Sequence, residues 1–243
     1  MSKILITGGC SFSECVSTNI DTWPRHLARS IPEYTHIPTA MGSQGNGLIS
    51  RKIIYEVSKA LNSGVSPSDI LVCIMWSGSN RHDSYFQLAN SAYTKNSEGW
   101  MENPTKVVDD NPIKGWYIFN HHWKTPLNIS HYRDFYDSVM ASVQTLEHIL
   151  RVQWFLKSHS INYMMTTYME TVLTQVSHPE CKHLYAMVDR SHFLHIVGEY
   201  EWCKLKGSYP FPNKDDPHPG TEQHKEFTEK VILPFLKEKG YIS

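Results

Sequence analysis

Seven consecutive apolar residues, Ile70–Trp76, place the strongest restriction on the fold of this chain. A strand with no polar face must be covered on both sides, as happens in a parallel sheet between two layers of helices. A turn-forming segment at 66–69 precedes the run, and a polar loop at 77–81 follows it. The pattern therefore predicts a central strand of an α/β sheet that ends in a loop at the sheet edge.

The remaining segments alternate in the way that such a sheet requires. Apolar runs predict further strands just before Gly8, at 34–40 and at 161–168, and apolar spacing predicts helices at 21–31, after the glycine-rich loop with an apolar stripe from Ile49 to Leu61, at 131–158 and from His224 to Phe235. We expect parts of 170–198 to be helical, 202–212 to form a loop or a short edge strand, and Pro234 to bend or shorten the last helix. Alternating strands and helices indicate an α/β protein with a mostly parallel sheet.

Composition limits the class of protein. A chain of 243 residues fits one domain, and its 19% charged residues and net charge of −1 are those of a globular protein without strong attraction to nucleic acid. No apolar stretch approaches a membrane span, and the first residues do not read as a secretory signal. Five cysteines without metal-like spacing fit reduced thiols. We expect a cytoplasmic protein that needs neither a cofactor nor a metal and binds no nucleic acid or membrane.

The segment 82–130 shows no sustained period and is rich in aromatic residues. A segment of this length without a pattern is usually functional or an insertion with its own structure. We therefore predict a single domain, residues 1–243, that carries an aromatic-rich insertion at about 82–130. Its aromatic side chains have two open interpretations, which are lining a substrate pocket and packing the insertion onto the body.

A serine follows the first predicted strand. The strand ends in Gly8 and Gly9, and Ser11 comes just after them, where open α/β sheets place their ligands. A dinucleotide-binding turn would need a third glycine and an acidic residue after the second strand, and the sequence has neither. We therefore interpret Ser11 as a nucleophile.

Three further segments offer the groups that a serine nucleophile needs. Asp215 and His218 have a spacing that can place a carboxylate on an imidazole, which then acts as the base. Asn80 follows the central strand and supplies an uncharged donor for an oxyanion. A glycine-rich loop from Gly42 to Gly47 exposes backbone N–H groups, although a tight turn explains the same glycines.

Together, the Ser11 turn, the 42–46 loop, the 78–80 loop and the Asp215–His218 motif resemble the four blocks of the SGNH (GDSL-type) hydrolases, in the family's order. The resemblance covers the chain except for 82–130 and about 170–210. It implies a three-layer αβα sandwich with a flavodoxin-like sheet of about five strands. It also implies Ser11 as nucleophile and oxyanion donor, Asn80 as oxyanion side chain, His218 as base and Asp215 as the carboxylate that orients it.

The sequence departs from the family's pattern at three positions. Cys10 stands where an aspartate usually precedes the serine, and Arg81 stands where an aspartate usually follows the asparagine. The family's oxyanion glycine aligns with Ser43, which leaves Gly42, Ser43 and Gly45 as candidate backbone donors. We expect Arg81 and Asn46 to contact the substrate, and the cation of Arg81 favours an anionic or polyhydroxylated one.

These features predict a serine esterase that removes a short acyl group, with acetyl as the first candidate and a carbohydrate as a candidate carrier. Two alternatives use the same fold. An acyltransferase would pass the acyl group to an alcohol on a glycan, and a glycan-binding protein would lack catalysis altogether. The partner expected in each case is a small molecule or a carbohydrate, and the sequence leaves the oligomeric state open.

Overall fold

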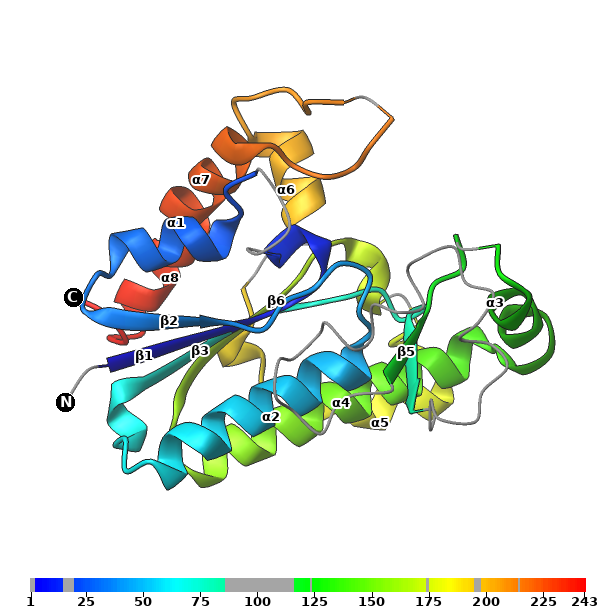
Figure 1. The fold of residues 1–243 in the computed structure, drawn as a ribbon, viewed down its shortest axis with the longest axis horizontal. Coiled ribbons are helices and arrows are strands. Elements are labelled where there is room, and N and C mark those ends of the chain that lie inside the picture. The colour runs from blue at the N-terminus through cyan, green and yellow to red at the C-terminus, as the bar shows by residue number, and fades with distance from the viewer. Residues whose placement is uncertain are drawn as a thin grey trace.

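A parallel sheet between two layers of helices forms the body of the protein (Figure 1). The computed structural model describes residues 3–14, 20–85, 116–122, 124–173, 175–194, 198–213 and 215–243. The sheet has the strand order β2-β1-β3-β6, and its strands are β1 (Lys3–Gly8), β2 (Tyr34–Pro38), β3 (Ile70–Trp76) and β6 (Asn162–Thr167). All three pairings are parallel, so the carboxyl ends of these strands meet at one edge.

The predicted α/β fold is confirmed, and the central strand has the predicted bounds. Every residue of β3 is buried, as its unbroken apolar sequence requires. The sheet has four strands in the described part of the chain, where we expected about five. Next to β6, at the place of a fifth strand, Met165 and Phe193 form only an isolated parallel bridge.

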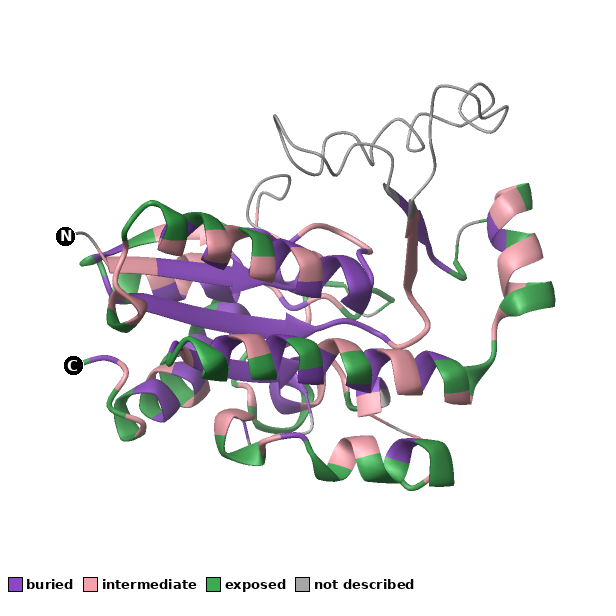
Figure 2. Ribbon diagram, turned by 90° about the horizontal axis from the view of Figure 1, so that it is seen from below, coloured by how far each residue is buried: buried purple, intermediate pink, exposed green. Residues whose placement is uncertain are grey.

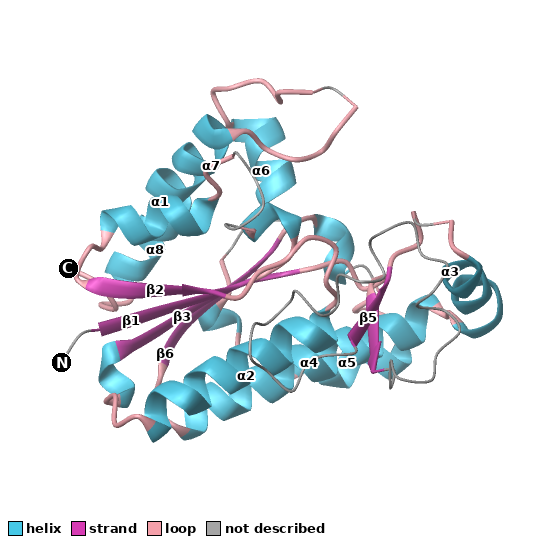
Figure 3. Ribbon diagram, in the orientation of Figure 1, coloured by secondary structure: helices cyan, strands magenta, loops and turns pink. Residues whose placement is uncertain are grey.

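Helices cover both faces of the sheet (Figure 3). One layer contains α1 (Trp23–Ser30), α6 (Glu199–Lys206), α7 (Thr221–Phe227) and α8 (Leu233–Glu238), and the other contains α2 (Asn46–Asn62), α4 (Ser138–Ser158) and α5 (Pro179–Ala186). A π-helical turn, Thr228–Ile232, separates α7 from α8. Pro234, which we expected to bend or shorten the last helix, lies in the first turn of α8, immediately after this π-helical turn. The buried residues concentrate between the layers (Figure 2).

Two expectations about helices are wrong. The predicted helix at 131–158 is interrupted, because a π-helical turn (His131–Phe135) follows α3 (Pro126–Ser130) and α4 begins only at Ser138. Asp137 caps α4 by accepting the N–H of Met140 at 2.8 Å. Residues 202–212, which we expected to form a loop or a short edge strand, are helical up to Lys206, the end of α6. Trp202 packs edge-on against Phe227 of α7, with 5.4 Å between ring centroids, and so ties this helix to its neighbour.

The described part of the predicted insertion forms a small sheet of its own. Strands β4 (His82–Tyr85) and β5 (Trp116–Phe119) pair in antiparallel fashion beside the amino-terminal ends of α2 and α4 (Figure 1). The expectations for residues 86–115 and for Cys15 lie outside the described residues. The other four cysteines are unpaired and buried. Among the described helices, none combines the length and the apolar character needed to cross a membrane.

Candidate active site

Ser11 and His218 meet at the carboxyl end of β1, although 207 positions separate them in the sequence. The Nε2 atom of His218 lies 2.7 Å from the Ser11 Oγ atom. Ser11 opens a short 3-10 turn, Ser11–Ser13, and the turn folds back so closely that a Cβ atom at Gly9 would lie 2.3 Å from the Ser13 Oγ atom. Only glycine fits at position 9, so Gly9 allows the serine to leave the strand in this direction.

Asp216 orients the imidazole of His218. The Asp216 Oδ1 atom accepts the backbone N–H of His218 at 3.0 Å and lies 2.5 Å from Nδ1 of the ring. Since a carboxylate only accepts, Nδ1 carries the proton and Nε2 is free to accept the Ser11 hydroxyl proton. The hydrogen bond from His218 lowers the pKa of Asp216, so this carboxylate is ionised at neutral pH. The ring of Phe12 supports the imidazole from the side, with centroids 4.8 Å apart.

The prediction that Asp215 fills this position is wrong in the geometry observed. The backbone N–H of Asp215 donates to the Asn213 Oδ1 atom at 3.0 Å, within an exposed turn. Pro217 separates Asp216 from His218 and fixes the φ angle between them. Asp216, two residues before the histidine, can therefore reach both the backbone and the ring of His218, and it binds the ring in place of Asp215.

The glycine-rich loop offers one backbone donor among the three predicted. The N–H of Gly42 donates to Glu14 Oε2 at 2.9 Å, and the N–H of Gly45 donates to Asp83 Oδ1 at 3.0 Å. Both groups are already used, which contradicts their assignment as oxyanion donors. The Ser43 N–H has no hydrogen-bond partner within the described ranges. Ser43 also has a positive φ of 65°, a conformation that turns its N–H out of the regular backbone direction.

Two carboxylates and a buried lysine hold this loop in place. Asp83 also accepts the N–H of Leu48 at 2.7 Å, so it caps the start of α2, and burial raises its pKa to about 6. The Nζ atom of Lys52 donates to the Thr39 carbonyl at 3.0 Å. Burial lowers the pKa of Lys52 to about 7, while the charges of Asp83 and Glu14 oppose the shift. The lysine therefore lies close enough to both carboxylates to interact with them electrostatically.

A pair of residues that follows β5 connects Ser43 to Asn80. Asn120 donates from Nδ2 to the Ser43 Oγ atom at 3.1 Å. Its neighbour His121 has its Nδ1 atom 2.8 Å from the Asn80 Nδ2 atom. Desolvation lowers the pKa of His121, so the ring is neutral at pH 7 and Nδ1 accepts one amide proton of Asn80. The other amide proton of Asn80 is left for a ligand.

The amide of Asn46, which we expected to contact the substrate, is bonded to the backbone of Ser77. The Asn46 side chain is buried, its Oδ1 atom accepts the Ser77 N–H at 2.8 Å, and its Nδ2 atom donates to the Ser77 carbonyl at 2.9 Å. These bonds join the start of α2 to the end of β3 and leave the amide unavailable to a substrate. The guanidinium of Arg81 donates to the Ser77 Oγ atom at 3.0 Å and lies 5.3 Å from the ring centroid of Tyr168.

A buried hydrogen-bonded pair, His224 and Glu199, fixes the helix that follows His218. His224 of α7 and Glu199 of α6 are 2.6 Å apart, between Nδ1 and Oε1, and both side chains are almost fully buried. Burial raises the pKa of Glu199, and the charges of His224 and His218 act against that shift. Because α7 begins three residues after His218, the pair fixes the helix that carries the histidine loop.

Several residues of this site have no signal in the sequence that would assign them. Glu14 and Asp83 lie two or three positions from the predicted Ser11 and Arg81, and the pairing of His121 with Asn80 spans 41 positions. Asp216 lies next to the predicted Asp215, and this adjacency is the one signal in the sequence that could have pointed to it. Among the described residues, no group of histidines, cysteines and carboxylates could hold a metal ion.

The fold of this chain has matches among solved structures, and the sequence identity to them is low. The crystal structure of TesA superposes with a TM-score of 0.52 at 12% identity, over 97% of this chain and 99% of that chain. The crystal structure of YXIM_BACsu from Bacillus subtilis gives a TM-score of 0.47 at 11% identity, over 99% of this chain but 57% of that chain. No protein-family model and no curated protein matches the sequence. The chain therefore shares with TesA an α/β fold over the full length of both.

Proposed function

We propose that the protein is a serine hydrolase of the SGNH (GDSL) type that cleaves short acyl esters. The observation that carries the proposal is the Ser11 Oγ to His218 Nε2 distance of 2.7 Å, with Nδ1 of the same ring held by Asp216. A hydroxyl, an imidazole and a carboxylate in this order form an activated nucleophile. The α/β sandwich that the chain shares with TesA is consistent with this assignment.

In the first half of the reaction, the Ser11 Oγ atom attacks the ester carbonyl carbon while His218 Nε2 takes the hydroxyl proton. The negative charge then forms on the carbonyl oxygen. Three donors support that charge in our proposal: the N–H groups of Ser11 and Ser43, which have no partner in the described structure, and the second amide proton of Asn80. The carbon–oxygen bond to the alcohol breaks, and the alcohol leaves with the proton from His218.

In the second half, water replaces the alcohol. His218 takes one proton from the water as its oxygen attacks the acyl carbon, and the bond to Ser11 breaks with return of that proton to Oγ. Asp216 stabilises the imidazolium that forms in each half. We propose acetyl as the acyl group and assign Arg81 to the substrate side of the site.

The test compares Ser11→Ala with Ser68→Ala, an exposed serine outside the site, in hydrolysis of p-nitrophenyl esters from acetyl to octanoyl. We expect Ser11→Ala to lose about 10³-fold or more in kcat/KM, with unchanged circular dichroism, and Ser68→Ala to match the wild type. The wild type should prefer acetyl. Full activity in Ser11→Ala would refute the mechanism. Hydrolysis by none of the proteins would favour the glycan-binding alternative, and acyl transfer to an added alcohol would identify an acyltransferase.

A further inference from the structure

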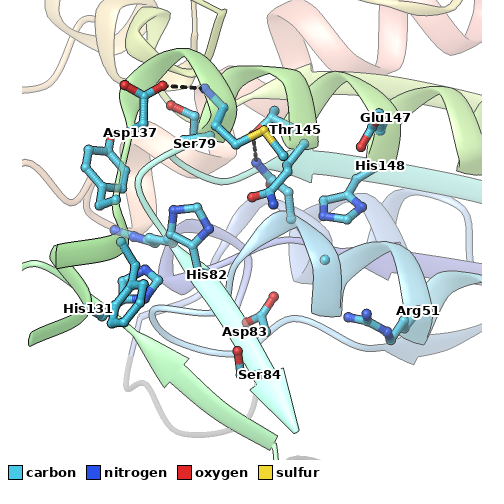
Figure 4. Close-up of a pocket in the computed structure, with 18 residues that line it drawn as sticks. Arg51, Ser79, His82, Asp83, Ser84, His131, Asp137, Thr145, Glu147 and His148 are labelled. Carbon is cyan, nitrogen blue, oxygen red and sulfur yellow. Dashed lines mark hydrogen bonds between the residues drawn. The ribbon is translucent and has the colours of Figure 1, made fainter. Parts of the chain in front are cut away.

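A second space lies beside the candidate active site, and the proposed reaction does not account for it. This cavity has a volume of about 350 Å³ and lies between α2, the segment 79–84, the π-helical turn after α3, and α4 (Figure 4). Its size falls at the lower end of the range for small-molecule pockets, about 300–1,000 Å³. Neither Ser11 nor His218 lines it, whereas Ser79 and Arg81 of the Asn80 loop do.

The wall of the cavity is polar and nearly balanced in charge. Only Gly47, Phe135, Met140 and Ala141 among its lining residues lack a polar side chain. Two guanidinium groups and three carboxyl groups line the same cavity, those of Arg51, Arg81, Asp83, Asp137 and Glu147. A hydrocarbon chain would offer no hydrogen bond to the buried Nε2 atoms of His82 and His131, and the mixture of charges does not select for a strongly ionic ligand. The wall therefore suits a neutral and polar molecule.

The histidines of the wall match the hydrogen-bonding pattern of hydroxyl groups. Burial lowers the pKa of His82 to about 4 and of His148 to about 3, so both rings are neutral at pH 7. A neutral imidazole offers one donor and one acceptor, as a hydroxyl group does. The Nε2 atoms of His82 and His131 are buried and have no hydrogen-bond partner in the described structure, so the fold leaves part of this capacity unused.

Aromatic faces accompany these polar groups. Phe135, which is 78% exposed, and Tyr136 border the cavity from the turn that precedes α4. A pyranose ring combines apolar C–H faces with an edge of hydroxyl groups, and this combination needs aromatic surface next to planar polar side chains. Figure 4 shows His82, His148, Asp83 and Arg51 around one space, from β4, α4 and α2.

A series of side-chain contacts leads from the cavity to His218, the base of the catalytic pair. Arg81 lines the cavity and lies over the ring of Tyr168 at 5.3 Å. Tyr168 packs edge-on against Phe12 at 5.0 Å, and Phe12 lies 4.8 Å from His218 between ring centroids. A ligand in the cavity would therefore contact Arg81, which is linked to His218 through Tyr168 and Phe12.

We propose that this cavity binds one monosaccharide unit, the alcohol part of the ester that Ser11 cleaves. The inference rests on the proposed function and specifies its substrate class. The sugar lies between α2 and α4, with its hydroxyl groups toward His82, His148 and Gln144, and presents its acylated oxygen toward the Asn80 loop.

A binding experiment tests the cavity without turnover. Saturation-transfer NMR is recorded with Ser11→Ala protein and methyl glycosides of glucose, galactose, mannose and N-acetylglucosamine. We expect at least one glycoside to bind, and His148→Phe and Ser84→Trp, added separately, each to weaken its affinity about tenfold. His159→Phe, the same substitution at an exposed histidine just after α4, should leave it unchanged. Absence of binding, or equal binding in all variants, would overturn the proposal.

A kinetic experiment links the cavity to the reaction. The ratio of kcat/KM for a methyl glucoside with a single acetyl group to that for p-nitrophenyl acetate should fall about tenfold in His148→Phe and stay constant in His159→Phe. The two proposals fail in different ways. Sugar binding without hydrolysis of any ester contradicts the hydrolase, whereas hydrolysis with an unchanged ratio in His148→Phe contradicts the sugar site.

Discussion

Replacement of Asp215 or of Asp216 by asparagine shows which of these two carboxylates is the partner of His218. In the structure, Asp216 accepts from both the backbone N–H and Nδ1 of His218, while Asp215 is exposed and its backbone N–H donates to Asn213. Asp216→Asn keeps the shape of the side chain but removes the charge that stabilises the imidazolium. An amide can also present its NH₂ group to Nδ1, which would favour the wrong tautomer.

The size of the effect follows from the exposure of the pair. Hydrogen bonds to charged groups contribute about 1.5–3 kcal/mol, which corresponds to about 10- to 150-fold in rate. The Asp216 side chain is 49% exposed and the His218 side chain 38%, so water screens the charge more than in a buried triad. We therefore expect a loss of about 10- to 100-fold in kcat/KM, well below the about 10⁴-fold known for a buried triad aspartate.

The assay is hydrolysis of p-nitrophenyl acetate by Asp216→Asn and Asp215→Asn, over pH 5 to 9, with unfolding curves for both variants. Asp215→Asn should stay within about twofold of the wild type, because its carboxylate contributes no contact to the ring in the structure. A large loss in Asp215→Asn together with normal activity in Asp216→Asn would refute the reasoning and restore the assignment predicted from sequence.

Three further predictions concern the groups around the reacting pair. Ser43→Gly should keep kcat within about threefold, since glycine adopts a φ of 65° freely, whereas Ser43→Val should cost about 1–3 kcal/mol of stability and lower kcat; a drop in kcat for the glycine variant would contradict a backbone donor at this position. His121→Ala should lower kcat about tenfold with little change in KM, because the Asn80 amide loses its orientation, while His122→Ala serves as the neighbouring control and equal effects would count against the contact. The pKa of Lys52 is lowered from 10.5 to about 7 in the fold, so between these values the unfolded chain binds the extra proton and wild-type stability rises with pH. Urea unfolding should therefore show Lys52→Met gaining relative to the wild type as pH falls from 10 to 7, and a pH-independent difference would show that the lysine is not buried as described.

Periodicity predicted the strands and helices whose burial depends on their own local pattern. The bounds of β3 follow from seven apolar residues in a row, and the glycines after β1 indicated the turn that exposes Ser11. The meeting of Ser11 with His218 follows because parallel strands end at one edge and the loop before the last helix can return to it.

Other features depend on contacts that no local pattern contains. The choice of Asp216 over Asp215 depends on the geometry of a turn around Pro217. The spacing between an aspartate and a histidine in the sequence does not contain that geometry. Whether Gly42 or Gly45 has a free N–H depends on Glu14 and Asp83, which come from other segments of the chain. The apolar stripe of 131–158 extended too far because Asp137 caps α4, and Phe135 before that cap is left exposed.

The pairing of Ser11 with His218 is tested most directly by covalent labelling. A fluorophosphonate reacts with a serine only when a base has activated its hydroxyl, and mass spectrometry of the digested protein locates the label. We expect one labelled residue, Ser11, and a labelling rate that falls at least about 10²-fold in His218→Ala. A label on another residue, or labelling of Ser11 at the same rate without His218, would contradict the account.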